Sequence, residues 1–124
     1  TAALDPTYED AYEVNNACYV NSGVGVCKYT GARGKSGTSE ASAEFVSEIR
    51  TLFDKNDVLW QIGEMGRVDL GGGGTVALYI AGLNVDVIDI GVPVLSMHSP
   101  FELVSKLDIY MTYKGILSFY EAKQ

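Results

Sequence analysis

Residues 85–102, with the sequence VDVIDIGVPVLSMHSPFE, decide the expected fold. Two short apolar runs, 85–90 and 92–96, are rich in Val and Ile and are typical of strands. Pro100 or Phe101 then begins a periodic stretch that predicts a helix to about Ala122, since proline suits the first turn of a helix. Strands at this position are therefore followed directly by a long helix.

The preceding part of the chain predicts two further strands, at residues 24–29 and 58–62. Between them a helix is expected from about Ser39 to Asp54, with Thr38 or Ser39 as its cap. Its apolar residues recur at helical spacing: Phe45, Val46, Ile49, Leu52 and Phe53.

Two glycine-containing segments are expected to be loops. Residues 31–37 read GARGKSG and predict a flexible basic loop, after which Glu40 would lie in the first turn of the helix. Residues 71–74 are four glycines, and Thr75 is expected to cap a short helix through Ala81.

Alternation of strands and helices predicts one α/β unit over residues 1–124, built on a largely parallel sheet. The final helix has apolar residues on two sides, so one side is expected to face the sheet and the other to face further protein. The two bands are Leu103, Leu107, Tyr110 and Leu117, and Ile109, Tyr113, Ile116 and Tyr120.

Charge and composition exclude several classes of partner. The 124 residues carry a net charge of -7, which disfavours general binding to nucleic acid. No apolar run approaches the roughly 18 residues that span a bilayer, so no membrane partner is expected. Cys18 and Cys27 are too few for a disulfide framework and match no common zinc spacing. We expect two buried, reduced thiols and a cytoplasmic protein.

Three features could carry chemistry. His98, the only histidine, follows a predicted strand, at the sheet edge where ligands usually bind, although a lone histidine is more often structural. Lys28 ends another strand and points toward the same edge. The glycines of 71–74 with Thr75 offer backbone N–H groups to an anion or oxyanion, or simply form a tight turn. No Gly-Lys-Ser/Thr follows them, as a phosphate loop would require.

Four groups of residues form recognisable motifs: KYTG at 28–31 with Gly34-Lys35, Gly63-Glu64 leading to VDLGGGGTVA at 68–77, VIDIGVPVLSMHSPFE at 87–102, and KLDIYMTYK at 106–114. Together these motifs resemble one family, the aminopeptidase I / aspartyl aminopeptidase family in its bacterial form. The similarity is to the carboxyl-terminal part of that family and covers essentially the whole chain.

This resemblance implies a zinc-dependent exopeptidase that removes amino-terminal residues from peptides, with two metal ions in one site. The implied fold is a phosphorylase/hydrolase-like three-layer αβα sandwich, of which residues 1–124 would form the carboxyl-terminal portion. The upstream part of the catalytic domain and an inserted second domain would lie on further polypeptide. Members of the family are similar in forming large homo-oligomers, such as dodecamers.

By the same resemblance, His98 becomes a metal ligand, and Lys28, Gly73, Gly74 and Thr75 become substrate-binding residues. The remaining ligands and the catalytic base of the family belong upstream, so no catalytic residue is assigned to this chain. The isolated chain is therefore expected to be inactive, because one imidazole without a base cannot perform two-metal hydrolysis.

Two other functions stay open at this stage. The doubly apolar last helix and the eight tyrosines are also typical of a non-catalytic assembly module with an oligomerisation surface. A weaker alternative is an anion-binding domain that uses the glycine run.

Overall fold

The structure is a computed structural model that describes residues 1–122 except 34, 35, 68 and 71. Three α-helices, two short 3-10 helices and eight short strands follow one another in the described chain. The helical elements are η1 (Pro6–Ala11), η2 (Val14–Asn16), α1 (Ala43–Lys55), α2 (Ala77–Ala81) and α3 (Lys106–Glu121). The strands are β1 (Val24–Cys27), β2 (Tyr29–Ala32), β3 (Ser36–Glu40), β4 (Trp60–Ile62), β5 (Gly72–Gly73), β6 (Asp89–Gly91), β7 (Val94–Leu95) and β8 (Leu103–Val104).

The strands form three small sheets, in the orders β4-β1-β6, β3-β2-β5 and β7-β8. Strand β1 runs parallel to β4, but every other pairing of named strands in the described chain is antiparallel. The α/β class is confirmed, whereas the expected largely parallel sheet is wrong. Of residues 31–37, expected to be a loop, 31 and 32 lie in β2 and 36 and 37 lie in β3, while 34 and 35 are outside the described residues. Strands β2 and β3 are antiparallel, since a connection this short cannot join parallel strands.

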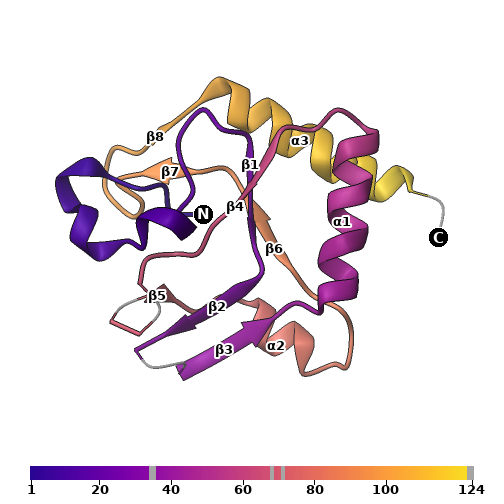
Figure 1. The fold of residues 1–124 in the computed structure, drawn as a ribbon, viewed down its shortest axis with the longest axis horizontal. Coiled ribbons are helices and arrows are strands. Elements are labelled where there is room, and N and C mark those ends of the chain that lie inside the picture. The colour runs from indigo at the N-terminus through magenta and orange to yellow at the C-terminus, as the bar shows by residue number, and fades with distance from the viewer. Residues whose placement is uncertain (34–35, 68, 71, 123–124) are drawn as a thin grey trace.

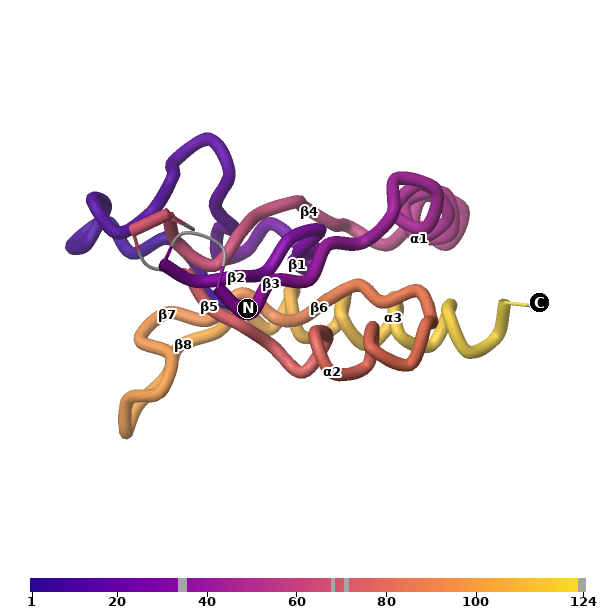
Figure 2. Tube along the Cα trace, turned by 90° about the horizontal axis from the view of Figure 1, so that it is seen from below, coloured from indigo at the N-terminus to yellow at the C-terminus, as the bar shows by residue number. Residues whose placement is uncertain are grey.

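The core lies on one face of β1. Val24 and Val26 are buried there and pack with Ile49 and Phe53 of α1 and with Val58. Helix α3 reaches the same core, since Met111 packs against it. Figures 1 and 2 show α1 and α3 at the same end of the molecule, away from the N-terminal segment.

The opposite face of β1 is occupied by the N-terminal segment. A side chain at Gly25 would meet Sγ of Cys18 at 2.9 Å, and one at Gly63 would meet the same atom at 2.8 Å. Cys18 and Cys27 are both buried and free of disulfide bonds, as expected. The pKa of the Cys27 thiol is lowered to about 7, and the largest cause is a hydrogen bond from Cys18.

Both long helices begin later than the sequence pattern predicts. Thr38, Ser39 and Glu40 lie in β3, and the cap of α1 is Ser42, whose Oγ accepts from the backbone N–H of Phe45 at 3.2 Å. Helix α3 is capped by Ser105, because residues 96–104 form the β7–β8 hairpin instead of a first helical turn. Polar capping residues, more than apolar periodicity, set these two boundaries.

The packing of α3 is the reverse of the expected one. Its buried residues are small or polar: Asp108, Thr112, Gly115 and Ser118. Both expected apolar bands are mostly exposed, with Ile109, Tyr110, Tyr113, Ile116, Leu117 and Tyr120 all open to solvent. The prediction that one band faces the sheet is therefore wrong. None of the described helices is long and apolar enough to cross a bilayer.

The polar face of α3 is buried because its polar groups are satisfied. The carboxylate of Asp108 accepts hydrogen bonds from the backbone N–H groups of Asn21 and Gly23, at 2.6 and 2.7 Å. Thr112 donates to the backbone carbonyl of Asp108 at 2.7 Å. Gly115 lets the helix approach closely, since a Cβ there would lie 3.1 Å from the Phe53 ring. Buried polar groups are tolerated when they are hydrogen-bonded in this way.

Candidate functional site

His98 lies in the turn of the β7–β8 hairpin, which Figure 2 shows projecting away from the helices. Leu95 pairs with Leu103, so residues 96–102 form the turn. The histidine is exposed and has a φ of +72°, in the left-handed region that non-glycine residues seldom adopt. The structure therefore presents the imidazole at the surface, not in the apolar core.

The backbone of His98 is held by a carboxylate four residues further on. Its N–H donates to Oε1 of Glu102 at 2.6 Å. Two more bonds close the turn, one from the backbone N–H of Ser99 to the carbonyl of Ser96 at 3.0 Å and one from Oγ of Ser99 to the carbonyl of Phe101. The turn is thus fixed by its own hydrogen bonds.

Two residues of the glycine run, Gly72 and Gly73, form strand β5, and Gly74 follows the strand. Gly73 pairs with Gly31 of β2, and Gly72 pairs with Ala32, while Gly71 lies outside the described residues. Backbones of Gly31 and Gly73 meet here without side chains between them. The run was expected to be a loop, and the structure instead uses part of it as a sheet edge.

Thr75 ties the glycine run to β6. Its hydroxyl donates to Oδ2 of Asp89 at 2.9 Å and accepts from the backbone N–H of Ala77, the first residue of α2, at 3.2 Å. Thr75 therefore contacts the start of α2 but is not its cap: the cap residue is Val76, which makes no side-chain cap hydrogen bond, so the expectation that Thr75 caps this helix is wrong. Asp89 is a residue that the sequence pattern did not single out, since it reads as one polar position of an alternating strand.

Lys28 lies between β1 and β2, and its ammonium group pairs with the carboxylate of Glu40. The carbonyl of Lys28 also accepts from the backbone N–H of Ala41 at 2.8 Å. Both side chains of the pair are partly exposed. A substrate carboxylate at this position would therefore have to compete with Glu40 for the ammonium group.

A second residue not singled out by the sequence is Tyr29. Its hydroxyl is buried and has no hydrogen-bond partner among the described residues, and it would lie 3.0 Å from a Cβ added at Gly31. Burial of the hydroxyl raises the pKa of Tyr29, and the carboxylates of Glu64, Asp69 and Glu40 raise it further. The only available signal was its place in the KYTG motif beside Lys28.

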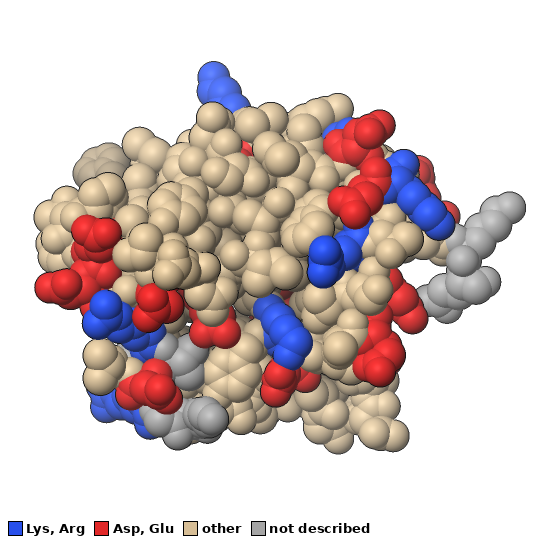
Figure 3. Space-filling view, viewed as in Figure 1, with Lys and Arg blue, Asp and Glu red and all other residues tan. Residues whose placement is uncertain are grey.

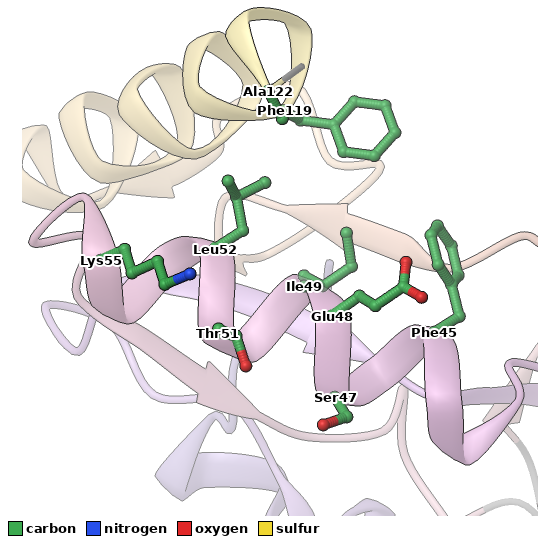
Figure 4. A pocket seen from close by; sticks show the side chains of 9 residues that line it. All are labelled: Phe45, Ser47, Glu48, Ile49, Thr51, Leu52, Lys55, Phe119 and Ala122. Carbon is green, nitrogen blue, oxygen red and sulfur yellow. The ribbon is translucent and has the colours of Figure 1, made fainter. Parts of the chain in front are cut away.

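The structure groups the candidate residues in two places (Figure 1). Gly73 lies beside β2 in one sheet, and Lys28 directly precedes that strand. His98 lies in a different sheet, in the β7–β8 hairpin. A separate apolar groove of about 470 Å³ lies between α1 and the end of α3, where Ile49 and Leu52 point toward Phe119 (Figure 4). None of the five candidate residues lies on these two helices.

Zinc coordination needs about four donors, of which a catalytic site takes three from protein. Among the described residues, no group of three or more His, Cys, Asp or Glu side chains could hold a metal ion. An exposed imidazole on a hydrogen-bonded turn nevertheless suits a single zinc ligand, since zinc binds neutral imidazole. The residues that the structure describes therefore form no complete zinc site by themselves.

Comparison with known proteins identifies the class. The family model described as "Aminopeptidase I zinc metalloprotease (M18)" matches residues 1–120. A protein named "Probable M18 family aminopeptidase 1" from Thermotoga maritima is 47% identical over 120 residues, which are 97% of this chain and 27% of the relative. A relative of the same name from Clostridium acetobutylicum is 46% identical over 119 residues, which are 96% of this chain and 26% of the relative.

Solved structures agree with these matches. The crystal structure of the M18 aminopeptidase from Thermotoga maritima superimposes with a TM-score of 0.91 at 47% identity, over 97% of this chain and 27% of that chain. The structure of aminopeptidase I from Clostridium acetobutylicum gives 0.92 at 45% identity, over 98% and 27%. The protein is therefore of the metallopeptidase class. It belongs to the aminopeptidase I zinc metalloprotease family, M18, and spans about a quarter of the length of the relatives it matches.

Proposed function

We propose that this chain is the carboxyl-terminal part of a zinc-dependent aminopeptidase and that His98 supplies one metal ligand. The observation that carries the proposal is the exposed imidazole on a fixed turn, within a chain that matches the M18 family over residues 1–120. The complete protein would hold two zinc ions. The other ligands and the base would come from the rest of the same polypeptide, which would also complete the three-layer sandwich.

When bound, zinc would act as a Lewis acid that polarises the scissile carbonyl of a peptide. His98 would orient the ion through one imidazole nitrogen, and the hydrogen-bonded hairpin would keep the ring in place. Gly73 and Gly74, which have no side chains, would let a peptide backbone approach β5. Thr75 would hold the residues that follow β5 in place through its hydrogen bond to Asp89.

The function of His98 is tested in the complete protein by replacing it. In His98→Ala, zinc content and aminopeptidase turnover should fall together, while the matched variant Met97→Ala in the same exposed turn should keep both. A His98→Ala protein with unchanged zinc content and unchanged turnover would contradict the proposal. The isolated 124-residue chain is expected to be inactive in the same assay.

Lys28 would attract the carboxylate of an acidic amino-terminal residue in the substrate. Because Lys28 already pairs with Glu40, the substrate carboxylate would replace Glu40 in that ion pair. We therefore expect Lys28 to affect the choice between substrates and not to be required for turnover. Lys28→Met should lower kcat/KM for a peptide beginning with Glu more than for one beginning with Leu, and Lys28→Arg should preserve the ratio. Equal losses on both substrates would remove Lys28 from substrate recognition.

An assembly role is a second candidate, which the exposed outer face of α3 favours. We expect the complete protein to be a cytoplasmic homo-oligomer, with two free buried thiols in keeping with a reducing compartment. Light scattering of the isolated chain separates the peptidase function from the assembly function. A stable, inactive oligomer would favour assembly.

Nucleic acid is not expected as a partner. Around the margin of the face in Figure 3, basic side chains alternate with carboxylates, which gives nucleic acid no continuous basic surface among the described residues there.

A further inference from the structure

The turn that carries His98 contains an acidic residue with a defined contact. Oε1 of Glu102 accepts the backbone N–H of His98 at 2.6 Å, across a turn closed by the pairing of Leu95 with Leu103. A charged acceptor at this distance makes a stronger hydrogen bond than a neutral one. Glu102 therefore fixes the backbone of the very residue that carries the imidazole.

The conformation of this backbone is an uncommon one. His98 has φ +72° and Ser96 has φ +56°, so two non-glycine residues of one short turn are left-handed. Such conformations cost free energy and persist only where surrounding contacts impose them. The hydrogen bond to Glu102 holds the backbone of His98 itself. The hydrogen bond from the backbone N–H of Ser99 to the carbonyl of Ser96 holds the same turn.

We propose that Glu102 is a positioning residue for His98: its carboxylate holds the left-handed backbone that aims the imidazole at the metal. This inference rests on the proposed function, because it takes His98 as a zinc ligand. Glu102 contacts the backbone of the ligand and not its ring, so its role is to restrict orientation. Groups that orient a metal ligand typically change metal affinity by about 10- to 100-fold when removed.

The exposure of the turn makes this inference testable. His98 and Glu102 are both exposed, and Phe101, which lies between them in the sequence, is 90% exposed, so the turn contributes little to the core. Replacement of Glu102 should leave the thermal unfolding of the zinc-free protein unchanged. A change in zinc affinity would then report orientation and not folding.

The experiment compares Glu102→Ala and Glu102→Gln in the complete protein, with Glu121→Ala at the exposed end of α3 as the matched carboxylate control. Zinc affinity is measured by competition with a chromophoric chelator, beside turnover and zinc-free thermal unfolding. We expect Glu102→Ala to weaken zinc binding by about 10- to 100-fold. Glu102→Gln keeps an acceptor oxygen, so its zinc affinity should be much closer to that of the unmodified protein. The zinc affinity of Glu121→Ala should equal that of the unmodified protein.

Each contrary result has a separate meaning. Unchanged zinc affinity in Glu102→Ala, while His98→Ala loses zinc, would overturn the positioning role and leave the proposed function intact. An equal loss in Glu102→Gln and Glu102→Ala would also overturn it, because the acceptor would then be irrelevant. A lower unfolding midpoint of zinc-free Glu102→Ala would assign the effect to folding. Zinc retained by His98→Ala would instead overturn the proposed function.

Discussion

Helices α1 and α3 pack against the same core but bury opposite kinds of side chain. Helix α1 buries Val46, Ile49 and Phe53, as its apolar periodicity predicts. Helix α3 instead buries small and polar residues and leaves its aromatic and aliphatic side chains exposed. The difference teaches that apolar periodicity identifies a helix but does not by itself identify the face that meets the nearest sheet.

The largest loss of stability is expected on the conventional helix, in Phe53→Ala. Phe53 is fully buried between Val24, Val26 and α3. Removing its ring should lower the free energy of unfolding by about 3–5 kcal/mol, through lost burial and the cavity that remains. Urea denaturation measures the change, and a loss below about 1 kcal/mol would show that Phe53 is not central to the core.

A slightly smaller loss is expected on the polar face of α3, in Asp108→Ala. The substitution leaves the backbone N–H groups of Asn21 and Gly23 without their acceptor, which should cost about 3 kcal/mol. Asp108→Asn keeps one carbonyl oxygen and should lose less in the same urea experiment. If Asp108→Ala were as stable as the unmodified protein, the buried polar face of α3 would have no stabilising role.

An intermediate effect is expected where the two helices touch, in Gly115→Ala. The new Cβ would lie 3.1 Å from two ring atoms of Phe53, which is tighter than most packing contacts of a Cβ atom. Overpacking should cost about 1–3 kcal/mol, partly offset by the better helix propensity of alanine, about 1 kcal/mol. A double-mutant cycle with Phe53→Leu, which makes room, should recover part of the loss. Strict additivity of the two substitutions would show that they do not touch.

The smallest effect is expected on the outer face of α3, in Tyr113→Ser. Tyr113 is 60% exposed, so the free energy of unfolding of this chain should change by less than about 0.5 kcal/mol. In the complete protein the same substitution should cost more, if further polypeptide or another subunit covers this face. Equal small effects in both forms would show that the outer face of α3 stays uncovered.

The sequence predicted the helices and the general α/β class because apolar residues at helical spacing have few alternative explanations. It missed the antiparallel pairings because residues 31–37 contain glycines, which read as a loop, although they join two strands. The reversed packing of α3 was unpredictable from local pattern, since it depends on Asp108 reaching backbone groups of residues 21–23. Long-range hydrogen bonds of this kind leave no periodic signal.

The candidate site was predictable to a different degree at each residue. His98 stands out as the only histidine of a recognisable motif, and its exposure agrees with a ligand role. Glu102 and Asp89 did not stand out, because a carboxylate that accepts a backbone N–H or a threonine hydroxyl looks like any other acidic residue in sequence. Tyr29 differs again, since only the structure shows that its hydroxyl is buried with no hydrogen-bond partner in the described part of the chain.

The role of His98 as a zinc ligand is tested most directly by locating zinc in crystals of the complete protein, through anomalous scattering at the zinc absorption edge. A zinc peak is expected about 2.0–2.1 Å from an imidazole nitrogen of His98, with the other ligands supplied by polypeptide outside these 124 residues. Zinc peaks that all lie beyond coordination distance of the His98 ring would contradict this role.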